Sequence, residues 1–189
     1  MNKKKTKMNW QTTDYNDGVN VQKLGAAGFS FVFPDSSGHI NSVVANRKGI
    51  LPKPVRTITI RYRISTISGN PTFQFVDHSG GGGLPPNFRP RIATSFLENR
   101  YWPSGVNCAI ITLTSGEQVY TVRCAPNLWQ DVNGGNNPKG FTSTLKKNGV
   151  WVISFGGGNN FEHGVFCNGG SAKFELLEFK IAKANNIAQ

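Results

Sequence analysis

The most constraining feature of the sequence is a stretch of strict alternation at residues 55–65 (VRTITIRYRIS). Every second residue from Ile58 to Ile64 is apolar, and the residues between them are threonine or arginine. Successive side chains of a β-strand point to opposite faces, so the pattern predicts a strand with one buried and one solvated face. Strands of this kind are typical of antiparallel sheets that cover a hydrophobic core on one side.

Other short segments carry a similar signal between Gly- and Pro-rich stretches. They are predicted as strands at 19–22, 28–33, 40–45, 72–76, 91–96, 106–113, 118–123, 150–155, 163–167 and 172–181. The segments 106–113 and 118–123 are expected to form a hairpin. A β-bulge at Leu176 and Leu177 would bring the apolar residues of the last segment to one face, and a turn is expected at Gly169 and Gly170. Residues 79–90 (SGGGGLPPNFRP) are predicted to be a loop, because prolines cannot donate to a ladder.

These segments predict an all-β fold, a two-sheet antiparallel β-sandwich of the jelly-roll type. At most one short helix is expected, at 141–147, because no long segment has apolar residues at helical spacing. We expect a flexible basic arm at 1–9, a single sandwich domain at 10–182 and a disordered tail at 183–189. A domain of this length needs no metal or disulfide to bury a sufficient core.

The chain has a formal net charge of +11, and four of its lysines lie in residues 1–7. Such a balance suits an anionic partner such as nucleic acid, an acidic polysaccharide or a membrane surface, and equally a merely solubilising surface. The basic residues are scattered and show no nucleic-acid-binding pattern, which argues against nucleic acid. No signal peptide and no membrane span are expected, because no apolar run follows the lysines. A virion, the cytoplasm and secretion after removal of a signal all remain open.

The cysteines give no sign of a metal site or of a disulfide framework. Cys108, Cys124 and Cys167 are an odd number without C-x-x-C spacing, which argues against zinc. In the expected hairpin Cys108 and Cys124 would lie opposite each other. Because cross-strand disulfides are geometrically demanding, reduced thiols are favoured, and the bond is left open.

Catalytic patterns are absent from the sequence. No strand offers two carboxylates two residues apart; Glu175 and Glu178 are three apart and are interpreted as a solvated face. There is no G-x-S-x-G motif and no phosphate-binding loop, so the chain is predicted not to be an enzyme. No cofactor is expected, although Asp14, Asp17 or Asp131 could contribute to a structural calcium site.

Aromatic residues beside polar ones are the remaining pattern with chemical meaning. A sugar presents an apolar C–H face, which stacks on aromatic rings, and hydroxyl groups, which need donors and acceptors. We therefore predict a carbohydrate site on a solvated strand face and an adjoining Trp-bearing loop. Its predicted residues are Arg61, Arg63, Gln74, His78, Arg89, Arg91, Arg100, Tyr101 and Trp102.

The order of these features resembles that of carbohydrate-binding-module-like jelly rolls of bacterial and phage proteins. The resemblance rests on four segments: an F-x-F strand at 29–33, a T-x-T-x-R strand at 57–63, the Tyr101-Trp102 loop, and an F-x-L-x-x-F-x-I strand at 174–181. The stretches 155–165 and 169–174 add to it. The resemblance implies a domain that binds glycans without cleaving them, and it raises a phage-encoded role.

The leading hypothesis is therefore a non-catalytic, lectin-like carbohydrate-binding β-sandwich. The alternative is a structural or adhesion protein of a virion or cell surface that associates with itself or with other subunits. A polysaccharide lyase or hydrolase comes third.

Overall fold

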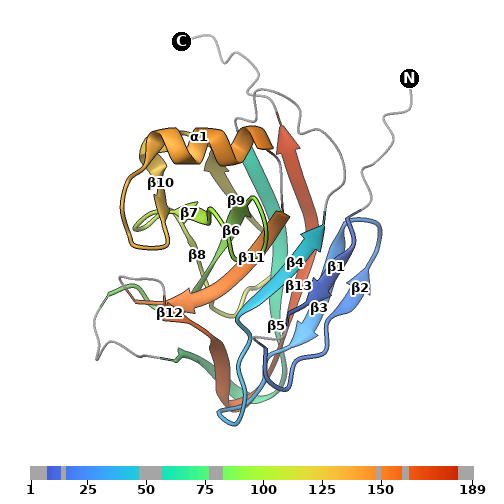
Figure 1. Cartoon of the computed structure of the whole chain (residues 1–189). Helices are drawn as coiled ribbons and strands as arrows, with labels where there is room; N and C mark the ends of the chain where they lie inside the picture. Colours follow the sequence, from blue (N-terminus) through green and yellow to red (C-terminus); the bar gives the residue numbers. More distant parts are fainter. Residues whose placement is uncertain are drawn as a thin grey trace.

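The computed structural model of the 189-residue chain describes residues 8–13, 16–46, 57–76, 83–147, 150–158 and 162–182, without the side chains of residues 46, 162 and 163. Their strands form two antiparallel sheets that face each other (Figure 1). The predicted all-β, two-sheet sandwich is confirmed. The arm and tail expected at the two ends fall almost entirely outside the described residues.

The first sheet contains eight strands in the order β1-β4-β11-β6-β7-β10, with β12 paired to β11 and β8 paired to β6. Their bounds are β1 (Trp10–Thr12), β4 (Ser42–Asn46), β6 (Asn87–Ala93), β7 (Tyr101–Pro103), β8 (Ala109–Ile110), β10 (Trp129–Asp131), β11 (Val150–Gly157) and β12 (Glu162–His163). The second sheet contains five strands in the order β2-β3-β13-β5-β9. Their bounds are β2 (Gln22–Leu24), β3 (Gly28–Val32), β5 (Thr57–Phe75), β9 (Gln118–Arg123) and β13 (Val165–Ala182).

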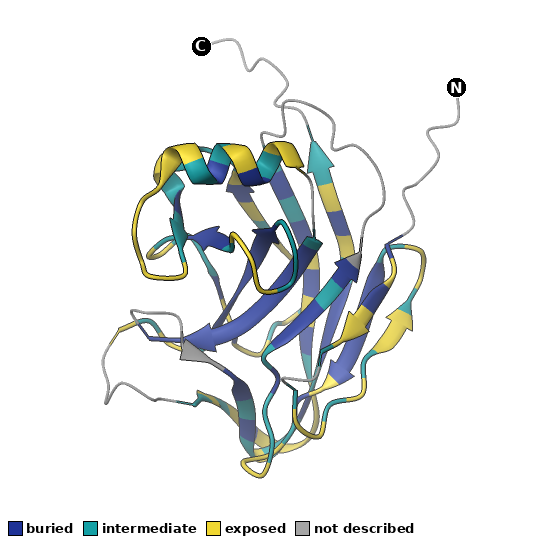
Figure 2. Cartoon of the chain, in the orientation of Figure 1, coloured by how far each residue is buried: buried dark blue, intermediate teal, exposed yellow. Residues whose placement is uncertain are grey.

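The core between the sheets is rich in aromatic rings. Phe174 is fully buried and lies within 5.3 Å, centroid to centroid, of the rings of Phe31, Phe88 and Phe155. The alternating residues of the first motif behave as predicted, since Ile58, Ile60 and Ile64 are all 0% exposed. Figure 2 shows the consequence as bands of buried and exposed residues along β5 and β13. By contrast, β6 is buried at all seven positions.

The long strands β5 and β13 correct the sequence prediction in two places. The segments 57–65 and 72–75 are parts of one 19-residue strand, and the turn expected at Gly169 and Gly170 is an irregularity within an 18-residue strand. Gly69 and Gly169 have φ angles of 64° and 72°, which glycine adopts without strain. Both strands therefore bend without ending, near the bottom of the view in Figure 1. The predicted bulge at Leu176 is confirmed by the register shift between Leu176 and Glu178.

The loop predicted at 79–90 ends earlier than expected, because β6 begins at Asn87 and contains Pro90. On the side away from β11, β6 pairs with β8 at Asn87 and Phe88 and with β7 at Ile92. Pro90 lies between these two pairings and has no partner residue on that side of β6. A proline is therefore tolerated there, although it cannot donate a backbone hydrogen bond. The strand predicted at 91–96 corresponds to the end of β6, which stops at Ala93.

The predicted hairpin of residues 106–113 and 118–123 is wrong. β8 pairs with β6 in the eight-stranded sheet, whereas β9 pairs with β5 in the five-stranded sheet. Cys108 and Cys124 are therefore not cross-strand partners, and both are free thiols. Two strands separated by a short turn in the sequence can each join a different sheet of a sandwich.

Helical structure among the described residues is limited to the 3-10 turn η1 (Pro126–Leu128) and the α-helix α1 (Pro138–Lys147). The α-helix begins three residues before the predicted one, where the Asn137 side chain accepts a hydrogen bond from the Gly140 amide. It lies across one end of the sandwich in Figure 1, and its Phe141 packs against Trp129 with 5.2 Å between ring centroids. Within the described part of the chain, neither helical segment has the length and apolarity to cross a membrane.

Candidate functional site

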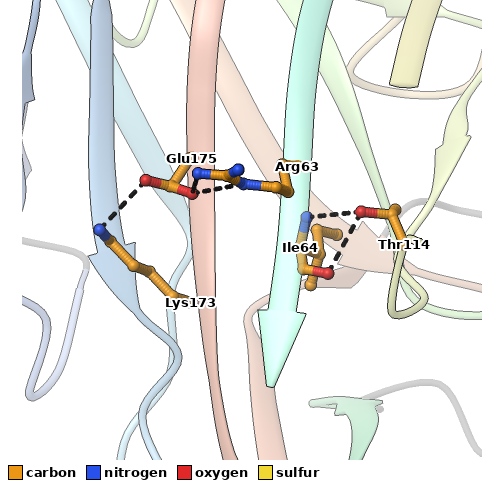
Figure 3. A network of polar contacts seen from close by, with 5 residues as sticks. All are labelled: Arg63, Ile64, Thr114, Lys173 and Glu175. Carbon is orange, nitrogen blue, oxygen red and sulfur yellow. Dashed lines mark hydrogen bonds and ion pairs between the residues drawn. The ribbon is translucent and has the colours of Figure 1, made fainter. Parts of the chain in front are cut away.

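The structure describes eight of the nine predicted site residues and divides them among three places. Arg61, Arg63 and Gln74 point away from the core on the outer face of the five-stranded sheet, the face turned away from the other sheet. Arg63 and Glu175 form an ion pair in which two nitrogens contact one oxygen, with Nε 2.8 Å and Nη2 2.6 Å from the Glu175 Oε2 (Figure 3). Arg61 lies 3.4 Å from a carboxylate oxygen of Glu117. These arginines therefore already have carboxylate partners within the chain.

Arg89, Arg91 and Trp102 lie on the outer face of the eight-stranded sheet, on the opposite side of the sandwich. Their neighbours along the strands belong to the core, so by alternation these three side chains point away from it. The single polar floor predicted from the sequence is therefore not formed. His78 lies outside the described residues.

Burial is the second correction. The sequence analysis placed Arg89 and Arg91 on a polar binding surface and Trp102 in a sugar-binding loop, but Arg89 is 0% exposed, and Arg91 and Trp102 are each 2% exposed. Alternation places Arg91 on the outward face of its strand but does not show that other segments cover that face. A tryptophan that is buried to this extent cannot offer its ring to a sugar in this conformation, so the predicted stacking role of Trp102 finds no support.

Arg89 is held by a dense set of contacts. Its Nε donates to the Asn87 Oδ1 at 2.9 Å, and its Nη1 donates to the Pro103 carbonyl at 2.7 Å. Burial lowers the pKa of Arg89, an effect that the neighbouring Cys108 and Tyr120 oppose. We interpret Arg89 as a structural residue that ties β6 to β7.

Arg91 makes weaker hydrogen bonds than Arg89. Its Nη2 donates a long hydrogen bond of 3.4 Å to the Phe96 carbonyl, and its guanidinium lies 4.8 Å from the centroid of the Phe96 ring. Its Nε is buried and has no hydrogen-bond partner among the described residues. Burial, followed by the positive charge of Arg100, lowers the pKa of Arg91 to about 10. Arg100 is thus close enough to disfavour the positive charge of Arg91.

Arg100 and Tyr101 line a pocket of about 210 Å³ at the β7–β10 end of the eight-stranded sheet. Tyr101 pairs with Asp131 across the β7–β10 ladder. Burial, followed by the negative charge of Asp131, raises the pKa of the Tyr101 hydroxyl. The full lining is Leu97, Asn99, Arg100, Tyr101, Asp131, Val132 and Asn133.

Sequence reasoning missed most of this pocket, although a turn signal was present. The Asp131 Oδ1 accepts hydrogen bonds of 3.0 Å from the amides of Asn133 and Gly135, and Gly134 has a φ of 76°. The sequence D-x-N-G predicts such a side-chain-stabilised turn. What the sequence could not show is that β7 and β10 pair and bring this turn beside residues 97–101.

The pocket combines two kinds of surface. Leu97 and Val132 are 54% and 44% exposed, which gives an open apolar surface next to the polar side chains. A second hollow of about 200 Å³ lies by β2, β3 and β13 on the five-stranded sheet and contains none of the predicted residues. Both pockets combine apolar and polar groups, as a specific site requires. The Arg100 pocket is the better candidate for the predicted site because it contains Arg100 and Tyr101, two of the residues that the sequence analysis selected.

The described residues contain no cluster of three or more His, Cys, Asp or Glu that could hold a metal ion. Of the acids proposed for calcium, Asp17 lies 3.6 Å from a ring nitrogen of His39, and one oxygen of Asp131 is used by the turn amides. Asp14 lies outside the described residues.

No protein-family model matches the chain, and no curated protein matches it. Among solved structures it is similar to the family 11 carbohydrate-binding module of the cellulosomal cellulase Lic26A-Cel5E of Clostridium thermocellum, with a TM-score of 0.47. The identity is 9%, over 97% of this chain and 91% of that chain. At such an identity and TM-score, this neighbour says nothing about what this chain binds.

Proposed function

We propose that the chain is a non-catalytic carbohydrate-binding β-sandwich whose binding site is the Arg100 pocket. The observation that supports this is the side-by-side arrangement of exposed Leu97 and Val132 with Arg100, Asp131 and Asn133 in one open pocket. The apolar pair suits the C–H face of a sugar ring. The charged and amide groups suit its hydroxyls, which both donate and accept hydrogen bonds.

The number of carboxylates in the pocket favours binding over cleavage. Glycoside hydrolysis needs two carboxyl groups, about 5–10 Å apart, on either side of the bond to be broken. Asp131 is the one carboxylate among the residues that line this pocket, and its Oδ1 already accepts two backbone hydrogen bonds.

The volume of the pocket suits a small ligand. It is below the roughly 300–1,000 Å³ of sites that take drug-sized ligands, so the pocket suits one sugar unit of a chain that continues over the surface.

Affinity gel electrophoresis against a panel of soluble polysaccharides tests the proposal. We expect at least one polysaccharide to retard the chain. We expect Leu97→Ala to weaken the binding about tenfold or more, because truncation removes about two to three CH₂ equivalents from the sugar contact. Leu113→Ala is the matched control, since Leu113 is similarly exposed, at 44%, and does not line the pocket.

Two results would contradict the proposal. One is a panel of neutral and acidic polysaccharides with no retardation at all. The other is binding that Leu97→Ala and Leu113→Ala reduce equally, which would place the glycan elsewhere on the protein.

A further inference from the structure

Arg100, which lines the pocket, and its neighbour Arg91 have no acidic partner in the part of the chain that the structure describes. Among the described residues the ion pairs join His39 to Asp17, Arg61 to Glu117, and both Arg63 and Lys173 to Glu175. Neither Arg91 nor Arg100 takes part in any of them. Arg61 and Arg63 of the five-stranded sheet are thus paired with carboxylates, whereas Arg91 and Arg100 are not paired with any carboxylate of the described residues.

The environment of Arg91 makes this excess of positive charge significant. Burying a cation without a carboxylate is costly, and the ring of Phe96 with one long hydrogen bond recovers only part of that cost. The lowered pKa of Arg91 reflects the same burial and the repulsion by Arg100. An anion beside Arg100 would relieve this repulsion from the open side of the pocket.

Asp131 does not serve as that anion. It lies in the same pocket but makes no ion pair with Arg100, and its Oδ1 is held by the amides of its own turn. The pocket therefore contains a cation, Arg100, and a carboxylate, Asp131, that are not paired with each other. A sugar unit that carries both a carboxylate and hydroxyls offers a partner to each of these groups.

We infer that the Arg100 pocket selects an acidic sugar, a uronate unit of a polysaccharide, whose carboxylate pairs with the Arg100 guanidinium while Asp131 and Asn133 bind its hydroxyls. The inference rests on the proposed carbohydrate-binding function and names its ligand class. A carboxylate is favoured because the planar guanidinium fork matches its two oxygens. Arg91, buried near Arg100, adds a fixed positive charge.

Isothermal titration calorimetry with two forms of one polymer tests this inference. Polygalacturonate carries a carboxylate on each unit, and its fully methyl-esterified form keeps the ring and the hydroxyls but loses the charge. We expect the acidic form to bind at least tenfold more tightly, since hydrogen bonds to charged groups are worth about 1.5–3 kcal/mol. Raising the salt concentration should reduce the difference only in part, because Arg100 is half-buried. Polymers with sulfate in place of carboxylate form a third arm.

The matched variants are Arg100→Gln and Arg61→Gln, which remove the same charge from opposite sides of the sandwich. Arg100→Gln should abolish the preference for the acidic form, Arg61→Gln should preserve it, and Arg100→Lys should restore it in part. The inference is overturned if both polymer forms bind equally, if sulfated polymers bind better than uronates, or if the two Gln variants lose the same affinity. If neutral polysaccharides bind and uronates do not, the carbohydrate-binding proposal stands without it. If no polysaccharide binds, that proposal fails as well.

Discussion

Glu175 offers the sharpest test of how the five-stranded sheet is held together. Its side chain is 8% exposed on the outer face, between Arg63 and Lys173, whose ammonium lies 3.1 Å from the Glu175 Oε1 (Figure 3). Glu175→Gln keeps the size of the side chain and removes its charge. The variant leaves two cations without their shared partner.

The expected loss of stability follows from the geometry. Arg63 binds the carboxylate through two nitrogens, and hydrogen bonds to charged groups are worth about 1.5–3 kcal/mol. The side chains of Arg63 and Lys173 are 44% and 38% exposed, so solvent screens both pairs and reduces their value. We therefore expect Glu175→Gln to lower the free energy of unfolding by about 1–2 kcal/mol at neutral pH.

The effect must also depend on pH in a defined direction. Burial raises the pKa of Glu175, but the hydrogen bonds from Arg63 and Lys173 outweigh it, and the net pKa lies below the ordinary value. A carboxyl group with a lowered folded-state pKa contributes stability above its unfolded-state pKa and loses it as the pH falls through the folded-state value. The difference between wild type and Glu175→Gln should therefore shrink on acidification and vanish once the carboxyl is protonated in both states.

Urea unfolding followed by tryptophan fluorescence, at neutral and at acidic pH, measures this difference. Glu178→Gln on the same strand is the control, because Glu178 is exposed and makes no ion pair among the described residues. It should change stability by less than about 0.5 kcal/mol. Equal effects of the two substitutions, or a Glu175→Gln effect that does not change with pH, would refute the assigned role of the ion pairs.

Three further predictions concern the fold. Phe174→Ala should cost about 3–5 kcal/mol in urea unfolding because it empties the aromatic centre of the core, whereas Val119→Ala, at a position 65% exposed, should cost almost nothing. Gly28→Ala should destabilise by about 2–3 kcal/mol because its methyl group would meet the backbone carbonyl of Leu176, while Gly116→Ala, which has open space, should be neutral by the same measurement. The three cysteines should react with a thiol reagent without prior reduction, because they are free thiols. The reaction should be slow in the folded chain and rapid in urea, since burial raises the pKa of each thiol. Rapid labelling of the folded chain would contradict this.

The sandwich itself was predictable because its signal is local. Alternation at 58–64, the F-x-F pattern at 29–33 and the apolar run at 150–155 each identify a strand and its buried face without knowledge of its partners. The bulge at Leu176 followed from the same parity reasoning. Which sheet a strand joins is decided by contacts between segments far apart in the sequence, and for this reason the hairpin assigned to β8 and β9 was wrong.

The candidate site was predictable only in part. Arg100 and Tyr101 were selected because an aromatic residue lies beside a polar one in the sequence, and both line the pocket. Leu97 and Val132 were missed, because an exposed aliphatic residue in a loop has no sequence signature of its own. Trp102 was expected in a loop because Pro103 and Gly105 follow it. A three-residue pairing with β10 makes it a strand residue instead.

The different fates of Arg61 and Arg91 show what alternation leaves undecided. Both arginines occupy the outward position between two core residues, yet Arg61 is half-exposed beside Glu117 while Arg91 is covered by the segment that carries Phe96. An aliphatic side chain at position 91 would fill the same space without the desolvation of a cation, so the stability of the fold alone gives no reason for an arginine there. The proposed uronate site would give one, because a buried cation near Arg100 would keep the electric field at that end of the pocket positive where surface charges would be screened.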